Sequence, residues 1–160
     1  MTTATPSPLI LCIGDSLTAG YQTPSPGHAS DGDTPYGHVL QDYLGERGRV
    51  EVSGICGEVT GEMVLRFRAT VLDRRPQMVI ILGGTNDLGW NADPTEIMRN
   101  LTKMYELARA SSITPVPVTV PSIRVDLGED NPDAASWVAQ HIQRRQRLNA
   151  MIADYAARKG

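Results

Sequence analysis

The chain contains two short apolar runs that each end in glycine and then in small polar residues. Residues 9–13 are followed by Gly-Asp-Ser-Leu at 14–17, and residues 78–82 by Gly-Gly-Thr-Asn-Asp at 83–87. A short apolar run that ends in glycine is typical of a buried strand breaking into a loop. In an open α/β sheet, ligands and chemistry lie at the carboxyl ends of the strands. The two motifs therefore predict one site shared by Ser16 and Asn86.

Strand-like and helix-like segments alternate along the rest of the chain. The strand-like runs are residues 9–13, 50–53, 78–82 and 113–120. Capping residues and helical periodicity predict helices that begin near Thr34, Thr60 and Asp93, and a long final helix over 133–159. This alternation predicts a single α/β domain over 1–160, with a mostly parallel sheet and helices on both faces.

The last strand-like run is expected at an edge of the sheet. It contains Pro115 and Pro117, and proline is confined to edge or bulged strands. No strand-like run follows it in the 160 residues, although the alternation leads one to expect a further strand. The sequence therefore predicts an open sheet edge, through which the chain can self-associate.

The spacing of apolar residues also predicts the buried faces of two helices. The helix after Thr34 groups its apolar residues on one face: Val39, Leu40, Tyr43 and Leu44. The final helix turns a second stripe inward: Val138, Ile142, Leu148, Ile152 and Tyr155. His141 lies beside that stripe and is expected on the helix surface.

Composition excludes several classes of protein. The 160 residues carry a net charge of −3, which gives no reason to expect nucleic acid or an anionic membrane as a partner. Two cysteines are too few for a disulfide framework. The N-terminus lacks the features of a signal peptide, and no apolar run approaches the length of a membrane span, so we expect a cytoplasmic protein. No glycine-rich nucleotide loop is present, and we expect neither a cofactor nor a metal.

The motif Gly14-Asp15-Ser16-Leu17 is the signature of the GDSL, or SGNH, hydrolases, and this chain resembles that family over almost its whole length. A second block is similar at 53–58, and a third at 84–87. The resemblance implies a flavodoxin-like three-layer α/β/α sandwich. It also implies that Ser16 is the nucleophile, and that the oxyanion hole is formed by the backbone N–H groups of Ser16 and Gly57 and the side-chain amide of Asn86.

One part of the family's pattern does not occur in this sequence. A serine hydroxyl needs an adjacent base to take its proton, and the family supplies that base from an Asp-x-x-His block after a fifth strand. The histidines here are His28, His38 and His141, and none has aspartate three positions before it. By comparison with the family, the chain lacks both the last strand and this block.

The remaining polar and aromatic residues near the motifs have simpler interpretations. Asp15 and Asp87 are expected to hydrogen-bond the loop backbone and hold the two motifs in place. His28 and His38 are expected in solvent-exposed positions near the first loop, although either is a candidate substitute base. Cys56 is interpreted as a small packing residue. For Trp90, a wall of the substrate pocket and a packing position in the core or in a lid remain open.

The sequence favours a GDSL-type serine hydrolase that acts on carboxylic esters of small molecules through an acyl-enzyme on Ser16. One alternative is a catalytically inactive pseudo-enzyme that binds ligands, because backbone N–H groups at a helix N-terminus bind anions readily. Another is a fragment that needs a partner chain to supply the Asp–His pair.

Overall fold

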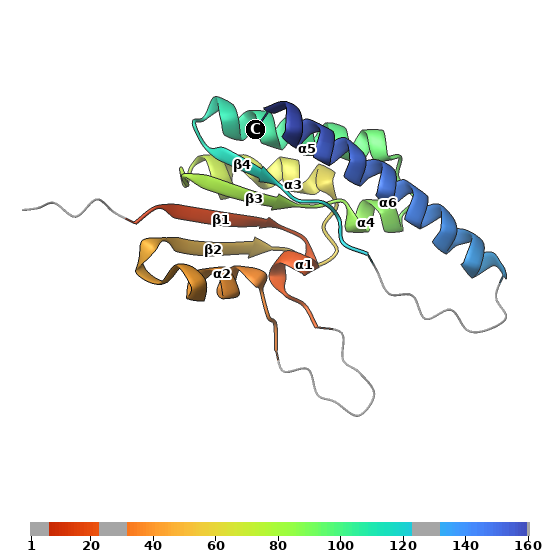
Figure 1. Ribbon diagram of the computed structural model, residues 1–160, viewed down its shortest axis with the longest axis horizontal. Helices are drawn as coiled ribbons and strands as arrows, with labels where there is room; N and C mark the ends of the chain where they lie inside the picture. The colour runs from red at the N-terminus through yellow and green to blue at the C-terminus, as the bar shows by residue number, and fades with distance from the viewer. Residues whose placement is uncertain (1–6, 23–31, 123–131, 160) are drawn as a thin grey trace, which may run out of the picture.

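The computed structural model describes residues 7–22, 32–122 and 132–159 (Figure 1). Within these ranges, four parallel strands form one sheet in the order β2-β1-β3-β4. The strands are β1 (Leu9–Gly14), β2 (Arg49–Gly54), β3 (Met78–Leu82) and β4 (Thr114–Pro117). The first three match their predicted runs to within one residue, and β4 is shorter than the run 113–120. The predicted α/β fold with a parallel sheet is confirmed.

Helices connect the strands, as the alternating pattern predicts. They are α1 (Ser16–Ala19), α2 (Tyr36–Leu44), α3 (Thr60–Phe67), α4 (Thr85–Gly89), α5 (Pro94–Ala110) and α6 (Pro132–Lys159), with a 3-10 turn at Gly45–Arg47 and a π-helical turn at Arg68–Leu72. Asp93 caps α5 as predicted, since its carboxylate accepts a hydrogen bond from the Thr95 N–H at 2.7 Å.

The predicted cap of α3 is wrong by one position. Thr60 is the first helical residue, and Val59 occupies the N-cap position. The Glu62 carboxylate accepts from the Val59 N–H at 3.1 Å and so satisfies that donor. Because Thr60 is not the cap, its hydroxyl is available for a contact with a different loop, described below.

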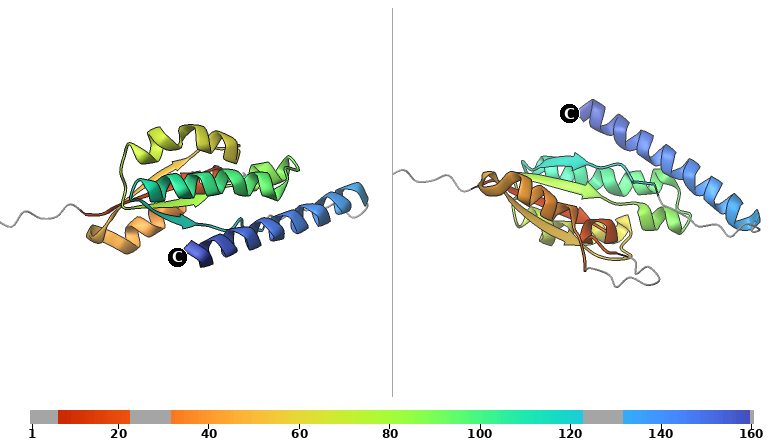
Figure 2. Two further views of the ribbon diagram at one scale, coloured as in Figure 1. Left: turned by 90° about the horizontal axis from the view of Figure 1, so that it is seen from above. Right: turned by 60° about the horizontal axis from the view of Figure 1, so that its bottom comes forward.

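The main hydrophobic core lies on one face of the sheet. Leu11 and Ile13 of β1, with Val79 and Ile81 of β3, are buried in one cluster with side chains of α3, α5 and α6. Successive strand side chains point to opposite faces, so Cys12 faces α2 instead, near Gly37. The views in Figures 1 and 2 agree that α6 runs alongside α5, while α2 lies at the β2 end of the sheet.

The predicted buried face of α2 is correct for Leu40 and Leu44, which are half-buried, and wrong for its other two residues. Val39 and Tyr43 are 71% and 75% exposed. The helix approaches the sheet through Gly37, where an added Cβ would lie 2.4 Å from Val52 Cγ2. This close approach sets the rotation of the helix, and the apolar pattern alone gives no sign of it. Thr34 does not cap α2 either, because Pro35 is the N-cap and the Thr34 hydroxyl accepts from the Gln22 side chain at 2.6 Å.

The inward stripe of α6 is confirmed only in its second half. Leu148, Ile152 and Tyr155 are buried, whereas Ile142 is 40% exposed. The prediction that His141 lies on the surface is wrong, because its side chain is only 2% exposed. His141 lies seven residues before Leu148 and therefore on the same side of the helix. The buried stripe thus continues through a polar residue.

Candidate active site

Three loops leave the carboxyl edge of the sheet at the same level. In the strand register, Gly14 of β1 is paired with both Gly54 of β2 and Leu82 of β3. The Ile55 N–H also donates to the Gly14 carbonyl at 3.0 Å. This register brings the segments of the predicted site residues to one edge of the sheet (Figure 1). Ser16 begins α1, Gly57 lies in the loop after β2, and Asn86 lies in the first turn of α4.

The loop that carries Ser16 is fixed by Asp15. Asp15 is the N-cap of α1, and its fully buried carboxylate accepts from the Leu17 N–H at 2.9 Å. Burial raises the pKa of the Asp15 carboxyl above its ordinary value, and the hydrogen bond from Leu17 opposes that rise. Ser16 is half-buried as the first residue of α1, where the backbone N–H has no partner within the helix.

Gly14 is required by close packing directly before this loop. A Cβ there would lie 2.2 Å from Thr18 Oγ1 and 2.3 Å from the Leu82 carbonyl oxygen. The second of these is backbone of the neighbouring strand, which cannot move aside without separating β1 from β3. The glycine therefore lets the chain turn into α1 while both strands stay in register.

Gly57 lies at the tip of the second loop. It is exposed, with φ at +79°, and an added Cβ would meet nothing within 4 Å. Glycine is therefore favoured here by backbone conformation rather than by space. Among the described residues, no hydrogen bond engages the Gly57 N–H. The turn is closed by the Glu58 N–H, which donates to the Ile55 carbonyl at 3.2 Å.

Asn86 is oriented by the second loop. Its side-chain Nδ2 donates to the Glu58 carbonyl oxygen at 2.9 Å. An amide nitrogen carries two hydrogens, so one N–H of Asn86 remains for a ligand at the sheet edge. This contact ties the loop after β3 to the loop after β2 next to Gly57.

Asp87 holds the same two segments together. Its buried carboxylate accepts from the Thr60 hydroxyl at 2.6 Å and from the Thr60 backbone N–H at 3.0 and 3.2 Å. Asn100 of α5 donates to the Thr60 hydroxyl oxygen at 3.1 Å. The contacts agree with the positions predicted for Asp15 and Asp87 as residues that hold the loops.

A partly buried ion pair that involves the second loop was not predicted from the sequence. Arg66 of α3 donates from Nε and from a terminal nitrogen to the two carboxylate oxygens of Glu58, both at 2.6 Å. The side chains are 17% and 5% exposed, respectively. One feature of the sequence could have predicted the pair. Arg66 lies three residues after Met63, beside the apolar stripe of α3, where an arginine needs a partner of opposite charge.

The histidines do not form a pair with Ser16 in the described ranges. His28 lies outside the described residues, and His38 is exposed on α2. His141 stacks on Trp137 with ring centroids 5.1 Å apart. Burial lowers the pKa of His141, the backbone of Leu88 opposes the shift, and neighbouring arginines lower the pKa further.

Two other predictions are decided by exposure. Trp90 is 81% exposed directly after the Asn86 loop, which excludes a place in the core. Cys56 is also exposed, so its interpretation as a packing residue is wrong.

Within the ranges that the structure describes, no cluster of metal-ligating side chains occurs. None of the helices in the same ranges is long and apolar enough to cross a membrane.

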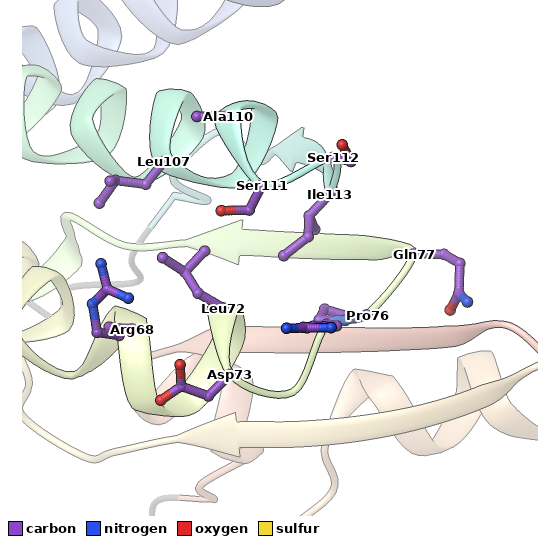
Figure 3. Close-up of a pocket in the computed structure, with 11 residues that line it drawn as sticks. Arg68, Leu72, Asp73, Pro76, Gln77, Leu107, Ala110, Ser111, Ser112 and Ile113 are labelled. Atoms are coloured by element: carbon purple, nitrogen blue, oxygen red, sulfur yellow. The ribbon is translucent and has the colours of Figure 1, made fainter.

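A larger hollow lies at the other end of the sheet. Its volume is about 710 Å³, and it lies between the π-helical turn and the end of α5 (Figure 3). The side chains drawn there include Arg68, Asp73 and Ser111. It contains none of the predicted site residues. A cavity of about 490 Å³ beside the second loop is lined by Gly57, Glu58 and Arg66 among others, but its lining does not include Ser16 or Asn86.

Known proteins share both the sequence pattern and the fold. Residues 12–160 match the GDSL-like lipase/acylhydrolase family. An arylesterase from Vibrio mimicus is 32% identical over 114 residues, which are 69% of this chain and 54% of that protein. A lipoprotein of Bacillus subtilis, YqeF, is 32% identical over 82 residues, which are 46% of this chain and 34% of that protein. The chain thus spans about half, or less, of the length of these curated relatives.

Solved structures with the same fold are 22–24% identical. TesA has a TM-score of 0.67, covering 92% of this chain and 73% of its own. The SGNH-hydrolase family esterase AlinE4 has a TM-score of 0.62, and the match covers 94% of this chain and 75% of the AlinE4 chain. A GDSL-like lipase from Bacteroides thetaiotaomicron has a TM-score of 0.61, and the match covers 93% of this chain and 63% of the lipase chain.

Proposed function

Because the chain belongs to the GDSL-like lipase/acylhydrolase family, we propose that it is a serine hydrolase of small carboxylic esters, acting through an acyl-enzyme on Ser16. The observation that carries the proposal is the strand register. Gly14 is paired with both Gly54 and Leu82, so the loops of Ser16, Gly57 and Asn86 leave the sheet together. This register supports the proposal that three hydrogen-bond donors act on a substrate bound at Ser16.

The proposed chemistry uses these residues in sequence. The Ser16 hydroxyl oxygen attacks the ester carbonyl carbon, and negative charge develops on the former carbonyl oxygen. The backbone N–H groups of Ser16 and Gly57 and the side-chain amide of Asn86 donate to that oxygen. Collapse of the intermediate expels the alcohol and leaves the acyl group on Ser16, from which water releases the acid.

The proton of Ser16 has to pass to a base. In the family, the histidine of an Asp-x-x-His block takes it, and this block does not occur in the 160 residues. Within the sequence, His28 and His38 are the candidate substitutes, and residues of a further segment or of another chain are the alternative. Each histidine can be tested by substitution once turnover has been measured.

The edge of the site favours esters with an apolar or aromatic group. Each of the three segments exposes one large apolar side chain within four residues of its site residue: Leu17, Ile55 and Trp90. Apolar surface at a rim stabilises a ligand by removing its own apolar surface from water. The name of the relative from Vibrio mimicus, an arylesterase, agrees with this substrate class.

Hydrolysis of p-nitrophenyl acetate by the full chain tests the proposal. We expect nitrophenol release that is lost in Ser16→Ala and retained in Ser111→Ala, a matched serine that is exposed at the opposite end of the sheet. Equal rates in the full chain and in Ser16→Ala would contradict the proposal. Acetate binding without turnover would instead favour the pseudo-enzyme, which retains the donors of the site.

The expected cytoplasmic location and the lack of nucleic-acid and membrane partners remain predictions. Self-association also remains a prediction, and it rests on the outer edge of β4. Within the described residues this strand is paired with β3 alone. Sedimentation of the chain at several concentrations measures the oligomeric state directly.

A further inference from the structure

Arg66 contacts two of the three segments that form the proposed oxyanion hole directly, and it is linked to the third through Glu58. It donates to the Glu58 carboxylate, to the Ser53 hydroxyl at 2.7 Å and to the Ser53 carbonyl at 3.1 Å. A terminal nitrogen also donates to the Gly14 carbonyl at 3.2 Å. One guanidinium therefore joins the end of β1, the end of β2 and the loop that follows β2.

The third loop is joined to Arg66 through Glu58. The carboxylate of Glu58 binds Arg66, and its backbone carbonyl accepts from the Asn86 side chain at 2.9 Å. Glu58 directly follows Gly57, so its position determines that of the Gly57 N–H. Movement of Glu58 would displace two of the three donors, Gly57 and Asn86, relative to Ser16.

We propose that Arg66 is a positioning residue that holds the Gly57 N–H and the Asn86 amide in place relative to Ser16. This inference rests on the proposed function, because it assigns those two groups to the oxyanion hole. Arg66 binds no substrate in this account. It acts through Glu58 and through the ends of the two strands.

The chemistry of the pair supports a positioning role over one in stability alone. A buried ion pair is often no more stabilising than apolar side chains of similar volume. A guanidinium presents five donors in a rigid plane, which lets it bind several acceptors in fixed directions. Here Nε and both terminal nitrogens of Arg66 are engaged. Lysine, with a single flexible ammonium group, cannot reproduce this arrangement.

The test compares the full chain with Arg66→Met and with the matched control Arg68→Met, an exposed arginine two residues further on. Arg66→Met leaves the Glu58 carboxylate buried without its partner, so the double variant Glu58→Met/Arg66→Met is included in case the single one does not fold. The first readout is hydrogen exchange of the Ile55 and Glu58 N–H groups, which bind the Gly14 and Ile55 carbonyls. The Ile113 N–H, bound to Ala108 at 2.9 Å at the other end of the sheet, is the internal reference.

We expect hydrogen exchange of the Ile55 and Glu58 N–H groups to accelerate about tenfold to a hundredfold in the Arg66 variants, because the hydrogen bonds of the charged guanidinium are lost. In Arg68→Met these bonds remain, so the exchange rates should not change. The second readout is hydrolysis of p-nitrophenyl acetate. There, kcat should fall by about the same factor while KM changes by less than about twofold, because a displaced oxyanion donor weakens only transition-state binding.

Two results would overturn the inference. One is unchanged exchange at Ile55 and Glu58 in a folded Arg66 variant, and the other is an unchanged kcat. If the full chain does not exceed Ser16→Ala, the proposed function fails instead. The exchange measurement then still decides whether Arg66 positions the loop.

Discussion

The contact between Asp87 and Thr60 gives the sharpest prediction of stability. The Asp87 carboxylate is 7% exposed and accepts from the Thr60 hydroxyl at 2.6 Å and from its backbone N–H at 3.0 and 3.2 Å. In Asp87→Asn, an NH2 group that cannot accept replaces one carboxylate oxygen, and the charge is lost. A hydrogen bond to a charged group contributes about 1.5–3 kcal/mol, so we expect a loss of about 2–3 kcal/mol.

Urea unfolding followed by circular dichroism measures this loss. For a chain of this size the same change lowers Tm by about 4–12 °C. The control is Asp42→Asn, an exposed aspartate on α2, which should change the free energy of unfolding by less than about 0.5 kcal/mol. An equally small change in Asp87→Asn would refute the argument that this carboxylate holds the two loops together.

Three further predictions concern the site and the helices around it. Gly84→Ala should cost about 1–3 kcal/mol in thermal unfolding, because Gly84 has φ at +113° and a Cβ would lie 3.0 Å from Leu148 Cδ2; an unchanged Tm would contradict this. Burial lowers the pKa of His141 in the folded chain. Below a pH of about 6.5 the unfolded chain therefore binds more protons at this residue than the folded chain does. The free energy of unfolding measured at pH 8 should accordingly fall as the pH drops below about 6.5. His141→Phe should remove that part of the pH dependence, and parallel curves for both proteins would count against it. Asn86→Ala should lower kcat/KM about a hundredfold to a thousandfold and stability by only about 1 kcal/mol, and a much larger loss of stability would make Asn86 a structural residue.

The strands and the site loops could be predicted from the sequence because both depend on local patterns. Apolar runs ended by Gly14 and Gly83 define β1 and β3 to within one residue. Parallel strands place their carboxyl ends at one edge of the sheet, so the sequence predicts that Ser16 and Asn86 lie in the same region. The pairing of Gly14 with Gly54 and Leu82 agrees with that expectation.

The helix orientations could not be predicted in the same way, because they depend on contacts across the chain. α2 packs through Gly37, a residue that hydrophobic periodicity ignores, and Val39 and Tyr43 are exposed as a result. The stripe of α6 includes His141, whose polarity suggested the surface. Arg66 was missed because its acceptors lie 8, 13 and 52 residues away in the sequence.

Acylation of Ser16 is the central step of the proposed mechanism. The measurement is the intact mass of the chain and of its Ser16 peptide after mixing with excess p-nitrophenyl acetate and quenching in acid, with Ser16→Ala treated alongside. We expect one added acetyl group on Ser16, formed together with released nitrophenol and absent from the variant. Nitrophenol release without acetyl on Ser16, or with the same label in Ser16→Ala, would contradict it.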